Sequence, residues 1–488
     1  MTRAAEQLHL VAVFLLAGTI AECKSPNLRS TLAATPVGAS ALAASDLAIL
    51  APLAASPSAA KEMFSVEGDG QCNVFGFDAG AADPILSRRL FQELSDQVFA
   101  QLPPVRVDPS LPAATQAMLT KINERLRSPA AKQDAKCGEA ISFTPFPDTV
   151  LLKTAAHIAR IKGILGGVCN YENWRIVSMR FDVCTDSPAV AGWDTATQLP
   201  KCQYTEFRLV AQPIVPADGG SHEVLDDAIH LIYRLDQPAA LIQSLRAFRA
   251  LSDDATKGSP WAEADRGGAR MLLPHPGLRA EMNRCNGPVS RAFRDLVTSY
   301  ARESQLTSLA WMTLSTAEAQ WTFRTSDVRG GHVVASEDPR IHENFSLNAF
   351  NSQQYPLTTD ETLATSIHPW YKSLAENTAA QARSFAPTVN ALLNPKVISQ
   401  QADAKHNSNC VSCHLADQTR DGLQTLAGSW PATNQYPAPP MWSPFIQRGH
   451  SMQNLRNFGY VPGFHFGVSA RTVNEVDALR DSVQRFFR

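Results

Sequence analysis

Two cysteines and a histidine stand close together late in the chain, in the pentapeptide Cys410-Val411-Ser412-Cys413-His414. Two thiols three positions apart can form thioethers with the two vinyl groups of one haem, and the next residue can place an imidazole on the iron. Random placement of 9 cysteines and 12 histidines in 488 residues would give this pattern about 0.004 times. The spacing therefore predicts one covalently attached haem c, with thioethers from Cys410 and Cys413 and with His414 as the proximal iron ligand.

Two other kinds of site use a C-x-x-C pair, and the flanking sequence disfavours both. A thioredoxin-like redox pair should follow a strand at the start of a helix, whereas residues 403–409 are polar and irregular. A zinc site would want four soft ligands, typically with a second pair at short spacing, and no other C-x-x-C or H-x-x-x-H occurs nearby. Haem attachment is the preferred interpretation.

Haem c is attached outside the cytoplasm, so the motif requires an export segment, and residues 1–23 have the features of a signal peptide. Arg3 supplies a positive charge, and residues 8–21 form an apolar stretch that is short for a transmembrane helix. Cleavage before Cys23 with lipidation is the alternative, although Glu22 stands where a lipobox has a small residue. We expect the protein in the periplasm or on the extracytoplasmic face of the envelope, and lipidation of Cys23, in the alternative, would be its membrane attachment.

The cysteine count fits an oxidising compartment. Without the two haem cysteines and Cys23, an even number remains, enough for three disulfides. These are Cys72, Cys137, Cys169, Cys184, Cys202 and Cys285. Cys184 ends one predicted strand and Cys202 begins the next, so the two could close the base of a hairpin. Buried free thiols are the alternative for some of the six.

Composition and charge narrow the class of protein. The net charge is −2, so no basic excess suggests a nucleic-acid partner. Residues 24–60 are rich in Ala, Ser, Pro and Leu, and we interpret them as a tether between the export signal and the folded body. The length that follows is enough for two or three domains with real cores.

Residues 61–360 predict an α+β domain built on an antiparallel sheet. Period-2 alternation of apolar and polar residues indicates strands at 174–184, 203–211, 228–235 and 321–324. Helical spacing indicates helices at 116–126, 150–165, 241–251 and 289–312. The domain has no G-x-S-x-G, H-E-x-x-H, P-loop or dinucleotide motif. Its scattered histidines are interpreted as structural, and His332 after Gly330-Gly331 is the most loop-like of them.

Residues 361–488 resemble small class I-like cytochrome c domains. A helical stretch at 374–393 precedes the pentapeptide, a Pro-rich segment follows it, and a last helix is predicted to begin at Ser469 as N-cap. An apolar stripe formed by Val476, Leu479, Val483 and Phe486 suits packing of that helix. The resemblance implies a mainly α haem-binding domain over about the last 100 residues, and only the pentapeptide is specific.

The resemblance also implies an axial methionine shortly before the last helix. Met452 occupies that place and is the expected distal iron ligand. Met441 is the next choice, and His450 or His465 would give bis-histidine ligation. An open sixth position is the remaining alternative.

These features predict an exported monohaem c-type cytochrome that transfers single electrons to or from a redox partner protein, rather than an enzyme. A haem-dependent peroxidase or oxidase, or a haem-based redox or gas sensor, are the alternatives. The sixth ligand separates them, because a closed His–Met site suits electron transfer and five-coordinate iron suits catalysis or sensing.

Overall fold

The computed structural model describes the parts of the chain that form the sheet and its supports. These are residues 42–53, 74–79, 83–100, 168–183, 193–194, 199–200, 205–216, 222–225, 227–235, 238–258, 274–281, 287–315, 320–336, 343–346, 458–461, 465–469 and 471–473, with isolated positions at 113, 116, 117, 120, 379, 380, 383, 384, 386, 387, 414, 420, 475, 476, 479 and 480.

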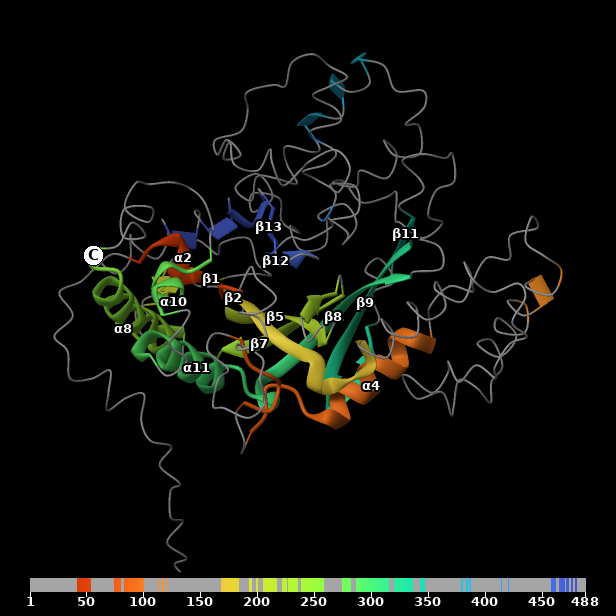
Figure 1. Ribbon diagram of the computed structural model, residues 1–488, viewed down its shortest axis with the longest axis horizontal. Helices are drawn as coiled ribbons and strands as arrows, with labels where there is room; N and C mark the ends of the chain where they lie inside the picture. Colours follow the sequence, from red (N-terminus) through yellow and green to blue (C-terminus); the bar gives the residue numbers. More distant parts are fainter. Residues whose placement is uncertain are drawn as a thin grey trace, which may run out of the picture. The chain divides into compact units, whose positions relative to one another are not determined.

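The described residues are organised around a nine-stranded antiparallel sheet (Figure 1). Its main path has the order β1-β2-β5-β7-β8-β9-β10, with β6 added to β5 and β11 added to β9. The strands are β1 (Ala48–Leu50), β2 (Trp174–Val183), β5 (Thr205–Pro216), β6 (His222–Val224), β7 (Ala228–Leu235), β8 (Leu306–Ser315), β9 (Gln320–Arg329), β10 (His332–Ala335) and β11 (Glu343–Ser346). Two short ladders join β3 (Trp193–Asp194) to β4 (Leu199–Pro200) and β12 (Phe458–Val461) to β13 (His465–Val468).

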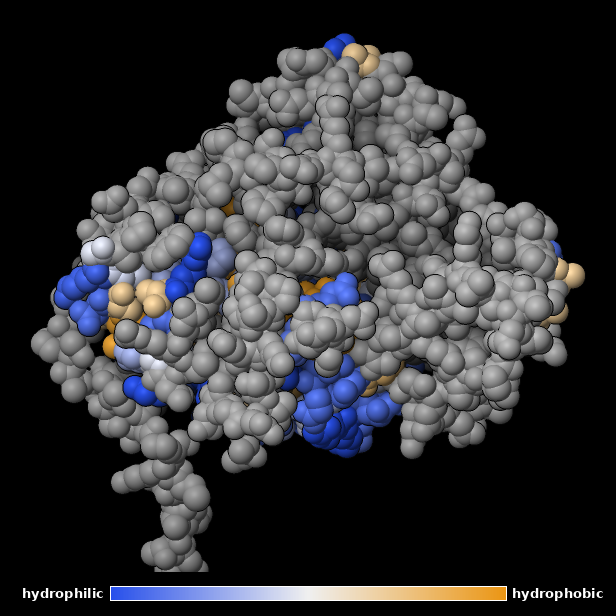
Figure 2. All heavy atoms as spheres, in the orientation of Figure 1, coloured by the Kyte–Doolittle hydropathy of each residue, from blue (hydrophilic) through white to orange (hydrophobic). Residues whose placement is uncertain are grey.

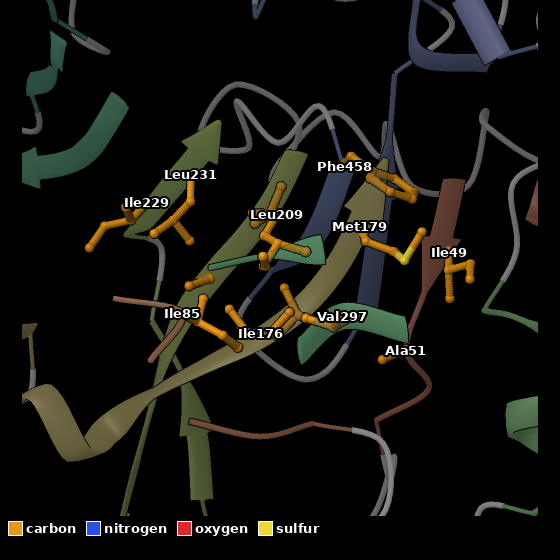
Figure 3. Close-up of a cluster of buried hydrophobic side chains, with 14 of the residues drawn as sticks. Ile49, Ala51, Ile85, Ile176, Met179, Leu209, Ile229, Leu231, Val297 and Phe458 are labelled. Atoms are coloured by element: carbon orange, nitrogen blue, oxygen red, sulfur yellow. The ribbon is translucent and has the colours of Figure 1, made fainter. Parts of the chain in front are cut away.

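Helices cover one face of this sheet, which we call the helix face. They are α2 (Ala44–Leu47), α4 (Arg88–Ala100), α8 (Pro238–Ala255), α10 (Pro276–Ala280) and α11 (Pro288–Tyr300), with 3-10 turns η2 (Tyr171–Asn173) and η4 (Glu303–Gln305). Met179, Leu209, Leu231 and Leu309 are opposite one another along the ladder, are fully buried and belong to this face. Figure 3 shows the first three of these side chains. Burying one such side chain contributes about 1.5–3 kcal/mol. These four side chains form part of the main hydrophobic core, which lies on the helix face of the sheet.

The prediction of an α+β fold with an antiparallel sheet is confirmed, and three strands lie close to their expected positions. The strand predicted at 228–235 is β7 without change, while β2 and β5 match the strands expected at 174–184 and 203–211. The strand expected at 321–324 is longer, because β9 runs from Gln320 to Arg329 and turns through Gly330 and Gly331 into β10. Both glycines have positive φ, of 60° and 76°, as a tight hairpin turn requires.

The prediction of one helix over 289–312 is wrong in its second half. Helix α11 ends at Tyr300, and β8 begins at Leu306. Apolar burial follows helical spacing at Phe293, Leu296 and Val297, then changes to alternation. That change of period marks the end of the helix. The sequence prediction missed the change because the strand that follows is also rich in apolar residues.

The interpretation of 24–60 as a tether is wrong for residues 42–53. Strand β1 pairs with β2 at the edge of the sheet, and all three of its residues are buried. Asp46 in α2 is also buried, and its carboxylate lies 3.3 Å from His275 Nε2 and 3.5 Å from Arg249 Nη1. The ion pair between Asp46 and Arg249 is buried, and removing one partner would leave the other charge unpaired.

Other predicted elements lie largely or wholly outside the described residues. They include the helices at 116–126, 150–165 and 374–393 and the proposed Cys184–Cys202 pair. Among the described cysteines, Cys169 is disulfide-bonded. The mainly α fold and the boundary at 361 stay predictions. Described residues of the C-terminal segment, including Phe458 and Tyr460, belong to the same hydrophobic cluster as the sheet. The N-cap at Ser469 is confirmed, since its Oγ accepts a hydrogen bond from the Thr472 amide at 3.1 Å.

Candidate functional site

The histidine of the pentapeptide is the one residue of the motif that the structure describes. His414 has helical backbone and is half-buried. Its ring centroid lies 5.1 Å from that of Phe323 and 6.4 Å from that of His230. The predicted thioether cysteines, Cys410 and Cys413, lie outside the described residues.

Strands β7, β8 and β9 present a second face of the sheet to His414. Directly paired residues of antiparallel strands place their side chains on the same side. The register pairs His230 with Val210 and Ala310, and Ala310 with Thr325. Phe323 lies two positions from Thr325 in β9 and therefore points the same way. We call this the His230 face.

His230 belongs to this face because of its place in the alternation of β7. Ile229, Leu231 and Tyr233 are fully buried on the helix face, whereas His230 and Ile232 between them are half-buried. We expected His230 to be an ordinary structural histidine. A signal was present in the sequence, since β7 sets one imidazole on the less apolar side of an otherwise apolar strand. The register that brings it to His414 was not visible.

The C-terminal strand β12 covers the β2–β5 part of the His230 face. The side-chain amide of Gln212 accepts a hydrogen bond from Tyr460 N at 2.7 Å and donates to Tyr460 O at 2.8 Å. Ser178 Oγ donates to the Phe458 carbonyl at 3.3 Å. The Tyr460 hydroxyl reaches the Ala51 carbonyl at 2.5 Å. These bonds fix the C-terminal segment on the same face that carries His230.

A half-buried ion pair adds a second attachment of the C-terminal segment. Glu475 pairs with Arg180 of β2 and with Arg471, whose Nε lies 2.8 Å from the carboxylate. Burial acts to raise the pKa of Glu475, but the charges of Arg180, Arg471 and Arg208 outweigh it and lower the pKa from 4.5 to about 2. The folded protein therefore holds this carboxylate in its charged form.

Acid is expected to weaken this attachment. The folded-state pKa lies below the ordinary value, so the stabilisation is present above pH 4.5 and is lost as the pH falls toward about 2. The shift sets a ceiling of about 3 kcal/mol on the loss. Urea unfolding across this range should show a steeper loss of stability for the wild type than for Glu475→Gln. The exposed pair of Arg88 and Glu172 provides the control, since Glu172→Gln should keep the wild-type slope, and parallel curves for all three proteins would contradict the assignment.

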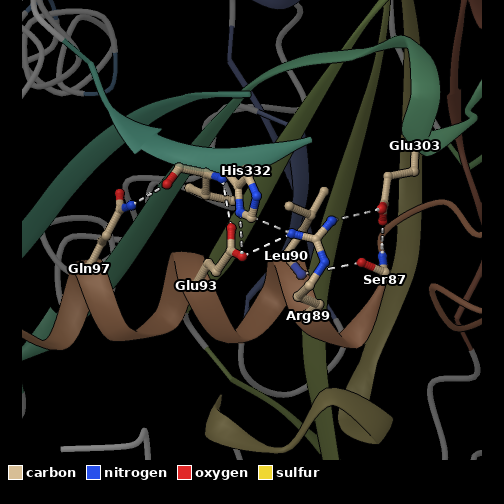
Figure 4. Close-up of polar contacts among 8 residues, drawn as sticks. Ser87, Arg89, Leu90, Glu93, Gln97, Glu303 and His332 are labelled. Carbon is tan, nitrogen blue, oxygen red and sulfur yellow. Dashed lines mark hydrogen bonds and ion pairs between the residues drawn. The ribbon is translucent and has the colours of Figure 1, made fainter. Parts of the chain in front are cut away.

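His332, the most loop-like of the histidines interpreted as structural, makes a structural contact (Figure 4). It begins β10 and lies 3.1 Å from Glu93 of α4, whose carboxylate also accepts the Val333 amide at 2.8 Å. Burial acts to raise the pKa of Glu93, but the Val333 amide, His332 and Arg89 lower it overall. This contact joins α4 to the β9–β10 hairpin. Hydrophilic residues gather over α4 in Figure 2.

The structure does not describe the side chains of the other ligands considered for the iron. Met452, Met441 and His450 lie outside the described residues, and His465 begins β13 in the ladder with β12. Within the described part of the chain, no group of three or more His, Cys, Asp or Glu could hold a metal ion. No helix among the same residues is long and apolar enough to cross a membrane.

Comparison with known proteins adds no relative. No protein-family model, curated protein or solved structure matches the chain.

Proposed function

We propose that this chain is an exported monohaem c-type cytochrome that binds one haem covalently and transfers single electrons. The pentapeptide Cys410-Val411-Ser412-Cys413-His414 carries the proposal, because its spacing is specific for haem c attachment. The surroundings of His414 fit the group, since a half-buried imidazole beside the apolar Phe323 ring is a suitable axial donor. Residues 361–488 would form the cytochrome c-like part.

The residues of the chain have distinct roles in this proposal. Cys410 and Cys413 would fix the macrocycle through thioethers, and His414 would bind the iron on one side. Haem c, when bound, supplies a one-electron couple between ferric and ferrous iron. Phe323, only 3% exposed, would keep water from the ring of His414, and a dry site shifts a redox potential. A redox partner protein would deliver or accept the electron at a small and weak interface.

The disulfide at Cys169 supports the exported location, because disulfides persist outside the reducing cytosol. Residues 1–23 would then serve as the signal peptide, with lipidation of Cys23 as the alternative. The periplasm or the extracytoplasmic face of the envelope is the proposed site of action.

Covalent haem is the direct test of this function. The full chain should be produced in a host with periplasmic haem c maturation, then denatured and stained for haem, and its intact mass should be measured. Wild type is expected to carry one haem that survives denaturation, because thioethers are not broken by unfolding. The double variant Cys410→Ser, Cys413→Ser should lose it completely.

Ser412→Ala is the matched control, since it changes the middle of the motif and leaves the C-x-x-C-H spacing intact. It should retain wild-type haem. A folded wild-type chain that matures without covalent haem would overturn the proposed function.

A further inference from the structure

We infer that His230 is the second axial ligand of the haem iron, opposite His414. This inference rests on the proposed function and assigns the residue that completes its site. It places the haem between the β7–β9 part of the sheet and the segment that carries His414. The sequence alone had favoured Met452 for this position.

The separation of the two imidazoles carries the inference. Their ring centroids lie 6.4 Å apart with the ring planes at 74°. A metal bonded to one nitrogen of each ring, at about 2 Å per bond, sets the two centroids about 6 Å apart. Axial rings can adopt any angle about the bond direction, so 74° is compatible with a shared metal. Both side chains are half-buried rather than solvated.

The neighbours of His230 suit a flat apolar group. Val210 and Ala310 flank it in the register, and Phe323 lies one strand beyond Ala310. Ala310, which pairs directly with His230, has only a methyl side chain, and the buried Met312 pairs with Phe323 on the same face. A strand in the middle of a sheet also holds its side chains rigidly, as a metal ligand requires.

Bis-histidine ligation would have two consequences. It would connect positions that are 184 residues apart (414 − 230), so the cofactor would join the sheet to the C-terminal segment. It would also give a lower reduction potential than His–Met ligation, because a thioether ligand raises the potential. A closed site of this kind suits electron transfer rather than peroxidase or sensor chemistry.

The spectra of the haem-loaded full chain test the inference. Wild type should be low-spin with the near-infrared and EPR signature of two imidazoles. His230→Ala should retain covalent haem but become high-spin, and added imidazole should restore the low-spin form by entering the space left by the side chain. His450→Ala and His465→Ala are matched controls that should keep the wild-type spectrum.

Each other outcome overturns the inference. A sulfur-to-iron charge-transfer band in wild type that disappears in Met452→Ala would assign the methionine, and five-coordinate wild-type iron would show an open site. An unchanged low-spin spectrum in His230→Ala would reduce the contact with His414 to an ordinary edge-on aromatic pair, for which this separation is also normal. If His230→Ala fails to fold, the wild-type spectrum still distinguishes ligation by two imidazoles from methionine ligation and from an open site. Absence of covalent haem from wild type is a different failure, since it refutes the proposed function itself.

Discussion

Trp174→Ala is expected to lower the free energy of unfolding by about 3–5 kcal/mol, the cost of removing a large aromatic side chain from a core. Trp174 begins β2 and is fully buried. Its ring meets Trp311 edge-on at 5.1 Å and stacks beside Phe77 at 6.3 Å. Its Nε1 donates to the Val168 carbonyl at 2.8 Å. The substitution removes the centre of this aromatic cluster together with its hydrogen bond.

Urea unfolding followed by circular dichroism gives the measurement, with Trp174→Phe as the matched variant. Phenylalanine keeps most of the apolar volume and loses the bond to Val168, so it should cost about 1–2 kcal/mol. Because Trp174 and Trp311 pack together, the loss should fall on the sheet as a whole, in a single transition. Equal costs for alanine and phenylalanine would show that the hydrogen bond, rather than packing, dominates.

Strands β2, β5 and β7 were predictable from sequence because each has two faces of different polarity. In β7 the alternation of Leu231 and Tyr233 with His230 and Arg234 marks the strand and its orientation. In β8 the apolar residues follow directly on the helix α11, so the change from one period to the other was not resolved. Edge strand β1 has three apolar residues and no pattern at all. Its burial depends on tertiary partners, among them the distant His275 that contacts Asp46.

The candidate site also has one part that the sequence predicts and one part that it does not. The pentapeptide is local, so its chemistry could be predicted from spacing alone. The position of His230 beside His414 depends on strand register, on which face of the sheet each residue occupies, and on the return of the chain after 184 residues (414 − 230). None of these is encoded in a short window of sequence. A histidine in an apolar strand therefore resembles any buried histidine until the sheet is assembled.

Gln212→Leu is expected to lower the free energy of unfolding by about 2–5 kcal/mol, because it leaves two buried backbone groups of Tyr460 without their partner. The Gln212 amide is fully buried and exchanges hydrogen bonds with both the N–H and the C=O of Tyr460, 248 residues away in the chain. Leucine has a similar volume, so packing is largely kept and the cost comes from unpaired polar groups.

Gln212→Leu should destabilise β12 more than the rest of the sheet, whereas Trp174→Ala should destabilise the whole sheet. Amide exchange of β12 (Phe458–Val461) should accelerate strongly in Gln212→Leu, while β7 and β8 keep their protection. Gln92→Leu is the control, since Gln92 bonds to Asp96 on the half-buried side of α4 and should cost under about 0.5 kcal/mol. If β12 stays protected in Gln212→Leu, the C-terminal segment is held by Glu475 and the hydrophobic contacts instead. In that case Arg180→Met, which removes a charge paired with Glu475, should release it where Gln212→Leu does not.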